Sequence, residues 1–201
     1  MSESDIIEFT VSLVGDSGVG KTSLINRKIL NSYQETSQTV GYNIFSDSFT
    51  KQSKLYEIKL VDPSGNPYYK DTIFPQIRSS HCIILVTDLT QTKESIETWY
   101  NKVASCLRKS TVFYYLAINK TEVIQDDLDQ VKLNEFQLFA DSLSISLCKV
   151  SAKSGSGVKE MFESIQKKLV LHSVSIKTNS LKLSSARHSR RLSEKKNSRC
   201  C

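Results

Sequence analysis

Short apolar segments rich in β-branched residues alternate along the chain with longer segments whose apolar residues recur every three or four positions. The first pattern is typical of buried strands and the second of amphipathic helices. Strands are expected at 8–14, 42–50, 55–62, 82–88, 112–118 and 145–150. Helices are expected at 22–30, 95–109, 133–143 and 157–171.

This alternation predicts an α/β fold with a mainly parallel sheet, in which ligands bind at the carboxyl ends of the strands. Only four residues, KQSK (51–54), separate the second and third expected strands. These two strands are therefore expected to form a hairpin.

The length of 201 residues and the 39% of hydrophobic residues favour a single hydrophobic core. No segment has the length of apolar residues that a membrane span needs. The net charge of +6 is concentrated in residues 173–201, where eight Lys or Arg side chains and one acidic side chain give +7. This segment is also poor in aromatic residues and cannot bury enough apolar surface to fold alone. We expect a folded domain over 1–172 and a disordered basic tail over 173–201.

The segment GDSGVGKT (15–22) lies between the first expected strand and the first expected helix. Gly15 and Gly20 bracket four residues and precede Lys21 and Thr22, which matches the pattern G-x-x-x-x-G-K-[ST]. A glycine-rich turn here lets successive backbone N–H groups converge on phosphate oxygens, and the helix start adds its positive dipole end. Lys21 would bridge the outer phosphates, and the Thr22 hydroxyl would ligate Mg²⁺. The pattern predicts a nucleotide site, with a ligand-free turn as the alternative.

Four further segments occur in an order that resembles a known family: TVG (39–41), LVDPSGNP (60–67), AINKTE (117–122) and VSAKSG (150–155). With the phosphate loop, they resemble the small GTPases of the Ras superfamily over almost all of residues 8–170. The resemblance implies the P-loop GTPase fold, a six-stranded mostly parallel sheet flanked by about five helices. It also implies GTP or GDP and Mg²⁺ as ligands.

The resemblance assigns roles to individual residues. Asp62 and Thr39 are expected to hold Mg²⁺ together with Thr22, and Gly65 is expected to meet the γ-phosphate. The residues expected to contact the nucleotide are Ser17, Gly18, Val19, Gly20, Lys21, Thr22 and Ser23 in the phosphate loop and first helix, Tyr33, Thr39 and Gly65 in the switch segments, and Asn119, Lys120, Glu122, Ser151, Ala152 and Lys153 around the base.

Within that superfamily, the Rab proteins are the most similar. GDSGVGKT (15–22), TVGYNIF (39–45) and DLTQTKESIETWYNKV (88–103) resemble Rab segments, and the chain ends in SRCC. Paired terminal cysteines receive two geranylgeranyl groups in Rab proteins, so the resemblance implies lipidation of Cys200 and Cys201. One short lipid chain anchors only marginally, whereas two chains and a basic tail would hold the protein on an anionic membrane.

The chain departs from the family pattern after the third expected strand, where small GTPases carry D-T-A-G-Q and this sequence has DPSGN (62–66). Asn66 replaces the Gln that orients the attacking water, and its amide is one methylene shorter. Phosphoryl transfer depends on positioning and charge stabilisation, so we predict slow intrinsic hydrolysis with Asn66 as the catalytic residue. Pro63 and Pro67 would also stiffen this segment.

A second departure is Glu122, in NKTE, where the family has N-K-x-D. A carboxylate here accepts hydrogen bonds from guanine N1 and N2, and Glu122 offers the same two acceptors. Its extra methylene must be absorbed by the loop or the base, so guanine selectivity is either kept or weakened. A solvated loop acid is the alternative interpretation.

Three functions of different classes were compared: a prenylated Rab-like switch, a nucleotide-binding scaffold that barely hydrolyses GTP, and an unrelated phosphate-loop enzyme such as a small-molecule kinase. No motif supports a second substrate, and the first function is expected, in vesicle trafficking. It implies a monomer at the cytoplasmic face of intracellular membranes with a cytosolic pool. Implied partners are effectors, exchange factors, GTPase-activating proteins, and prenylation and membrane-extraction chaperones, but no nucleic acid.

Overall fold

The computed structural model describes residues 6–108, 111–124 and 126–173. The chain divides into two compact units, Met1–Phe162 and Glu163–Cys201. The sheet and the helices α1 to α4 belong to the first unit. Apart from residue 173, the expected basic tail lies outside the described residues, and so do Cys200 and Cys201.

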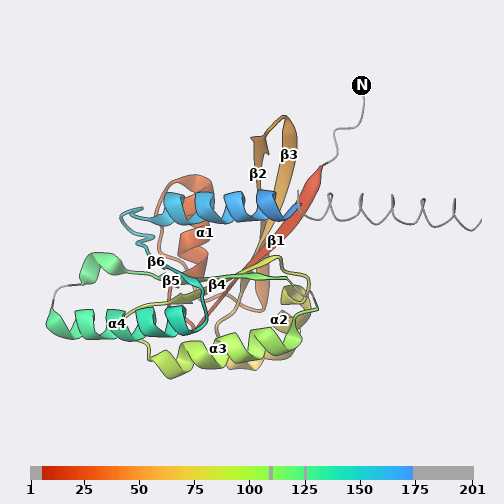
Figure 1. Ribbon diagram of the computed structural model, residues 1–201. Helices are drawn as coiled ribbons and strands as arrows, with labels where there is room; N and C mark the ends of the chain where they lie inside the picture. Colours follow the sequence, from red (N-terminus) through yellow and green to blue (C-terminus); the bar gives the residue numbers. More distant parts are fainter. Residues whose placement is uncertain (1–5, 109–110, 125, 174–201) are drawn as a thin grey trace, which may run out of the picture. The chain divides into compact units, whose positions relative to one another are not determined.

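Six strands form one sheet in the order β2-β3-β1-β4-β5-β6 (Figure 1). The pairs β3–β1, β1–β4, β4–β5 and β5–β6 are parallel, and β2–β3 is antiparallel. The strands are β1 (Ile7–Val14), β2 (Tyr42–Lys51), β3 (Lys54–Pro63), β4 (Cys82–Thr87), β5 (Phe113–Ile118) and β6 (Ser146–Lys149). The α/β fold with a six-stranded, mostly parallel sheet is confirmed.

The β2–β3 hairpin turns through Gln52 and Ser53, between the paired residues Lys51 and Lys54. Both turn residues have positive φ, 51° and 58°. Positive φ at both central positions matches the right-handed twist of paired strands in a two-residue turn. The hairpin therefore forms where the sequence predicted it.

The helices form at positions that agree only in part with the ranges expected from the sequence. The helices are α1 (Lys21–Leu30), α2 (Lys70–Ile77), α3 (Lys93–Cys106) and α4 (Asp127–Ser142), with a further helical segment over 158–173. Helix α4 begins six residues before the expected start, because the Asp126 side chain caps it by accepting a hydrogen bond from the Asp129 N–H at 2.8 Å. Helix α2 brings the number of helices in the described part of the chain to the five that the family resemblance implied, but no helical pattern located it in the sequence, and it contains Pro75.

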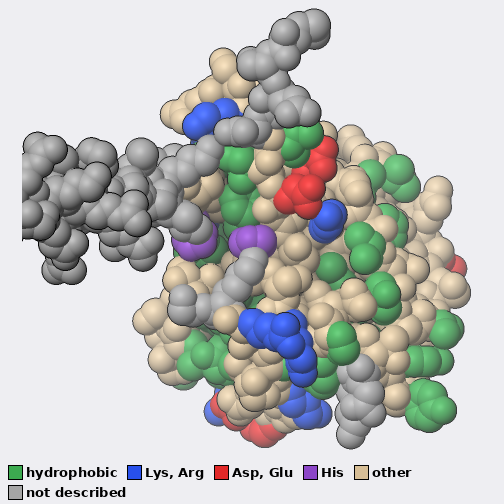
Figure 2. Space-filling view, turned by 90° about the vertical axis from the view of Figure 1, so that its right-hand side faces the viewer, with side chains coloured by type: hydrophobic (Ala, Val, Ile, Leu, Met, Phe, Trp, Pro, Cys, Tyr) green, Lys and Arg blue, Asp and Glu red, His purple; other side chains and the backbone are tan. Residues whose placement is uncertain are grey.

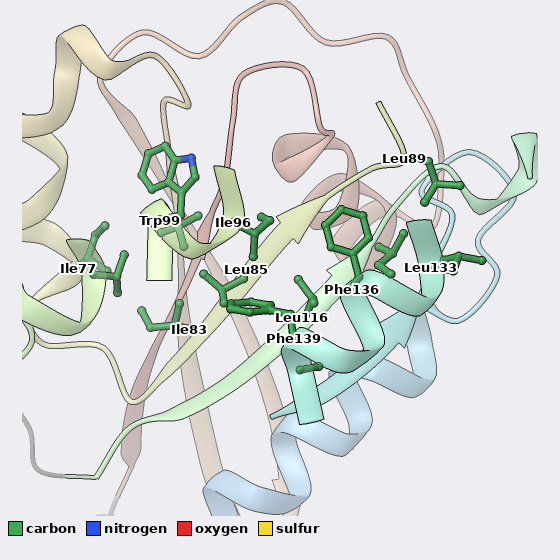
Figure 3. Close-up of a cluster of buried hydrophobic side chains, with 14 of the residues drawn as sticks. Ile77, Ile83, Leu85, Leu89, Ile96, Trp99, Leu116, Leu133, Phe136 and Phe139 are labelled. Atoms are coloured by element: carbon green, nitrogen blue, oxygen red, sulfur yellow. The ribbon is translucent and has the colours of Figure 1, made fainter. Parts of the chain in front are cut away.

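The main hydrophobic core lies between the sheet and helices α2, α3 and α4, while α1 lies on the other side of the sheet (Figures 1 and 3). Strand β4 is buried along its whole length. Its side chains alternate, so that Ile83 and Leu85 enter this core and Ile84 and Val86 point to the opposite face. A sheet that is covered on both faces leaves its carboxyl rim as the place where polar loops gather.

The surface of the described residues carries charges of both signs. On the face drawn in Figure 2, Lys or Arg side chains lie among Asp, Glu and hydrophobic ones. An ion pair between neighbouring strands joins Lys59 on β3 to Glu8 on β1 at 2.8 Å. Both side chains are exposed, and an exposed ion pair contributes little to stability.

Candidate functional site

A hollow of about 570 Å³ lies at the carboxyl rim of the sheet, and we call it the rim hollow. Loops that follow β1, β3, β5 and β6, and the segment before β2, contribute its walls. Its lining residues are Ser17, Gly18, Gly20, Lys21, Thr22, Ser23, Tyr33, Glu35, Thr36, Ser37, Gln38, Thr39, Gly65, Asn119, Lys120, Glu122, Ala152 and Lys153. Most residues singled out in the sequence therefore lie around one space.

Four of the expected site residues do not line the rim hollow. Val19, Asp62 and Ser151 are buried directly beside it, with exposed fractions of 0%, 0% and 1%. Asn66 differs, because its Oδ1 accepts a hydrogen bond from the Tyr68 backbone N–H at 3.0 Å. Its side chain caps the short 3₁₀ helix η1 (Pro67–Tyr69) and does not line the hollow.

The phosphate loop runs from β1 into α1 through backbone conformations that require glycine. Gly20 has a φ of 92°, and a Cβ atom there would lie 2.3 Å from the Asn119 amide nitrogen. Lys21 follows and folds back under the loop, where Nζ donates to the Gly15 carbonyl at 2.9 Å and to the Asp16 carbonyl at 2.8 Å. Burial lowers the pKa of Lys21 to about 8 against the attraction of Asp62. A cationic group is thus placed directly beneath the loop.

Three oxygen-bearing side chains from separate elements meet next to this lysine. The Thr22 hydroxyl on α1 donates to Asp62 Oδ2 at the end of β3, at 2.7 Å. The Thr39 hydroxyl lies 3.1 Å from Thr22 Oγ1 and 3.4 Å from Asp62 Oδ2. Burial raises the pKa of Asp62, and the hydrogen bond from Thr22 acts in the opposite direction.

This oxygen cluster, Thr22, Thr39 and Asp62, fits a hard divalent cation. Mg²⁺ takes oxygen ligands and is usually bound by one or two carboxylates with further oxygens from water or phosphate. Asp62 Oδ1 is buried and makes no hydrogen bond to the described residues, so it is available as a ligand. No cluster of three or more His, Cys, Asp or Glu side chains suited to a metal exists in the described part of the chain.

The other end of the rim hollow is braced by side-chain hydrogen bonds between loops. The Asn119 amide donates to the Val19 carbonyl at 2.9 Å, and its Oδ1 accepts from the Ala152 N–H at 3.0 Å. Arg27 on α1 donates to the carbonyls of Ala152 and Lys153 at 2.8 and 2.6 Å. Asn119 therefore fixes the loops after β5 and β6 to the phosphate loop. Arg27 adds a second link, which no sequence motif predicts.

Lys120 and Asp88 form an ion pair at the edge of the same region. Lys120 Nζ lies 2.5 Å from Asp88 Oδ2, and Asp88 Oδ1 accepts from the Thr90 N–H at 2.9 Å. Burial acts to raise the pKa of Asp88, but the hydrogen bonds from Lys120 and Thr90 outweigh it and hold the pKa below its usual value. Glu122 and Tyr33 line the hollow nearby, and Tyr33 is 42% exposed.

A model of the Ras family matches residues 10–171. The chain belongs to the Ras family. As a Ras-family protein it is a GTP-binding molecular switch, and small GTPases of this family bind guanine nucleotide with Mg²⁺ and generally hydrolyse GTP. Among the described residues of this Ras-family chain, no helix combines the length and apolar character needed to cross a bilayer.

One contact of the phosphate loop in this Ras-family chain has no counterpart in the sequence pattern. Asp16 occupies a variable position of the motif, yet both of its carboxylate oxygens accept hydrogen bonds from α3. Ser95 Oγ donates to Oδ2, and the Trp99 indole N–H donates to Oδ1 at 2.9 Å. Helical periodicity marks Trp99 as a core residue and gives no indication of this polar role.

Asp88→Asn should destabilise the protein in a pH-dependent way. The lowered pKa means that the Asp88 carboxylate stabilises the folded state above its unfolded pKa of about 4, and that this contribution is lost as the pH falls through the folded value. We expect a loss of about 2 kcal/mol in unfolding free energy at pH 7, typical of a charged hydrogen bond. The difference from the wild type should shrink below about pH 4.

Denaturant unfolding across this pH range measures the effect. Asp141→Asn is the matched control, because Asp141 is an exposed acid on α4 whose carboxylate accepts a hydrogen bond from the neutral Gln137 amide. It should change the unfolding free energy by less than about 0.5 kcal/mol. A wild-type advantage over Asp88→Asn that stays constant from pH 3 to pH 7 would contradict the assignment.

Proposed function

We propose that this Ras-family chain is a Rab-like, lipid-anchored switch in intracellular vesicle trafficking, and that it hydrolyses GTP slowly. The observation that carries the nucleotide-dependent part is the meeting of Thr22, Thr39 and Asp62, at 2.7 to 3.4 Å, beside the buried Lys21. These groups arrive from three elements that are distant in sequence. Such a convergence is what a Mg²⁺-bound phosphate requires.

In this proposal, the residues around the rim hollow divide by the part of the nucleotide that they hold. Backbone N–H groups of residues 17–22 would donate to phosphate oxygens, and Lys21 would add its charge. When bound, Mg²⁺ would be held by the oxygen cluster and neutralise phosphate charge. The base would lie against Asn119, Lys120, Glu122 and the loop of Ser151, Ala152 and Lys153, with Tyr33 at its edge.

Switching would use the two segments that touch the phosphate loop. Gln38, next to Thr39, donates to Ser17 Oγ at 3.1 Å. Gly65 packs so closely that a Cβ atom there would lie 2.2 Å from the Ser17 nitrogen. A γ-phosphate at this place would compete with Gln38 and Gly65 for contact with the phosphate loop. It would thereby change the positions of both segments, as in other nucleotide switches. Effectors would bind the GTP-dependent positions of these two segments.

Slow hydrolysis is supported by the place of Asn66. Its amide oxygen is used in the turn before η1, and its shorter side chain does not line the rim hollow. Because water positioning is the main task of this residue, a displaced amide is expected to reduce the rate. The same observation favours the second candidate, a membrane-anchored scaffold that binds the nucleotide but barely hydrolyses it.

Lipid anchoring through Cys200 and Cys201 rests on the sequence, since both residues lie outside the described part of the chain. Two geranylgeranyl chains would anchor the protein firmly, and the +7 tail would add attraction to anionic lipids of about 1 kcal/mol per basic residue near the surface. Exchange factors, GTPase-activating proteins and membrane-extraction chaperones are the partners that such a cycle needs.

Purified protein should retain GDP or GTP and lose it when Mg²⁺ is chelated. ATP at a thousandfold excess should not displace a labelled guanine nucleotide if Glu122 pairs with the base, and Glu122→Asp should keep or sharpen this preference. Glu35→Asp is the matched control, because Glu35 is a second acid that lines the rim hollow. Strong competition by ATP, or no retained guanine nucleotide, would overturn the proposal.

Asn66→Gln should accelerate single-turnover hydrolysis of bound GTP by about tenfold or more, because the longer amide can reach the water. Asn134→Gln is the control, because Asn134 is an exposed residue on α4, and it should leave the rate of GTP hydrolysis unchanged. No acceleration in Asn66→Gln would mean that Asn66 is not the cause of slow hydrolysis. Turnover undetectable in both proteins would favour the scaffold.

In cells, a tagged wild-type chain should lie on internal membranes with a cytosolic fraction. The double variant Cys200→Ser, Cys201→Ser should be wholly cytosolic, because the basic tail alone provides only a salt-sensitive attraction. Cys148→Ser is the control, since Cys148 lies on β6 and should not alter the distribution. Membrane localisation of the double variant would refute prenyl anchoring at these residues.

A further inference from the structure

The phosphate loop is attached to helix α3 by the side chain of Asp16. Trp99 Nε1 donates to Oδ1 at 2.9 Å, and Ser95 Oγ donates to Oδ2. Ser95 and Trp99 are four residues apart on α3 and thus lie on the same face of the helix. We refer to these two hydrogen bonds as the Asp16 contact.

The backbone of the same residue is a junction for the rest of the proposed phosphate site. The Asp16 carbonyl accepts from Lys21 Nζ at 2.8 Å. On the next residue, Ser17 Oγ accepts from Gln38. A Cβ atom at Gly65 would lie 2.3 Å from the Asp16 carbonyl carbon and 2.2 Å from the Ser17 nitrogen. The position of the Asp16–Ser17 peptide therefore affects Lys21 and both proposed switch segments.

Helix α3 provides this contact from a rigid position. Trp99 is only 8% exposed and belongs to the main core cluster together with Ile77 and Ile96 (Figure 3). Val103, one turn further along α3, is fully buried in the same cluster. The indole N–H is therefore held in place by packing, and its acceptor, Asp16, is only partly buried in the phosphate loop. A hydrogen bond to a carboxylate is stronger than one between neutral groups, and this contact joins the phosphate loop to a helix that the core holds in place.

We propose that Asp16 is a positioning residue of the nucleotide site, which attaches the phosphate loop to α3 so that α3 controls how long the nucleotide is retained. The inference rests on the proposed nucleotide site and extends it to residues that do not line the rim hollow. A partner that displaced α3 at Ser95 and Trp99 would release the loop without touching the nucleotide.

Nucleotide dissociation tests this proposal in the full chain. Trp99→Phe removes the indole donor while keeping an aromatic ring, and Ser95→Ala removes the second donor. Each variant should release a fluorescent GDP analogue about tenfold faster at saturating Mg²⁺, the change expected for one charge-assisted hydrogen bond. Thr98→Ala is the control, because the Thr98 hydroxyl on the same helix donates to the Glu94 carbonyl. It should leave the dissociation rate unchanged.

A double-mutant cycle separates positioning from a purely structural role. In an Asp16→Ala background, Trp99→Phe should cause no further increase in dissociation. If Asp16→Ala does not fold, Asp16→Leu provides the background, because its side chain has no acceptor for the indole N–H. Trp99 is the only tryptophan in the sequence, so its emission reports the contact directly. The emission should change when GDP is removed from the wild type and should not change in Asp16→Ala.

The outcomes are distinct. Additive effects in the double-mutant cycle would overturn the role of Asp16. The role would also be overturned by variants that lose thermal stability but release GDP at the wild-type rate. A wild-type protein that retains no GDP would instead refute the proposed nucleotide site.

Discussion

The burial of the sheet on both faces is the constraint on which the rest of the structure depends. With β4 enclosed along its whole length, the polar groups of the loops that follow the strands find their partners at the carboxyl rim. The loops there are held in place largely by side-chain hydrogen bonds to one another, as in the bonds from Asn119 to Val19 and from Ala152 to Asn119. The rim hollow is the space that these bonds enclose.

The two ends of the rim hollow are built in different ways. At the base end, Asn119 and Arg27 link the loops after β5 and β6 to the phosphate loop and α1 through backbone carbonyls and an N–H. At the phosphate end, Thr39 is joined to its neighbours by hydroxyl contacts of 3.1 and 3.4 Å. In the proposed function, the base would lie at the braced end, and the response to phosphate would fall to the segment that is joined by the longer hydroxyl contacts.

Much of this arrangement follows from local sequence patterns. The alternation of strands and helices predicted the sheet, and the spacing of Gly15, Gly20, Lys21 and Thr22 placed the loop at the start of α1. These features are predictable because strand burial and the phosphate-loop turn depend on residues that are close in sequence. The Ras-family match is consistent with the order of the later motifs.

The features that were not predicted depend on tertiary contacts. Helix α2 forms despite Pro75 because Ile73 and Ile77, one turn apart, are both fully buried in the core. Asn66 was expected at the site, but its side chain is used in a local turn, which competes for its amide oxygen. Nothing in the local sequence sets apart the charged residues Asp16, Arg27 and Asp88 from solvated ones. Their partners are distant in sequence, and only the fold brings them within hydrogen-bonding distance.

The close approach of Gly65 to the phosphate loop has a consequence for how this segment can change over evolutionary time. Backbone meets backbone there, so a methyl group at position 65 would meet peptide atoms that have no free rotation by which to move aside. Tyr68, three residues later, is 84% exposed and carries no such restriction. Only the smallest side chain therefore fits against the loop at position 65, whereas a substitution at position 68 meets no such barrier.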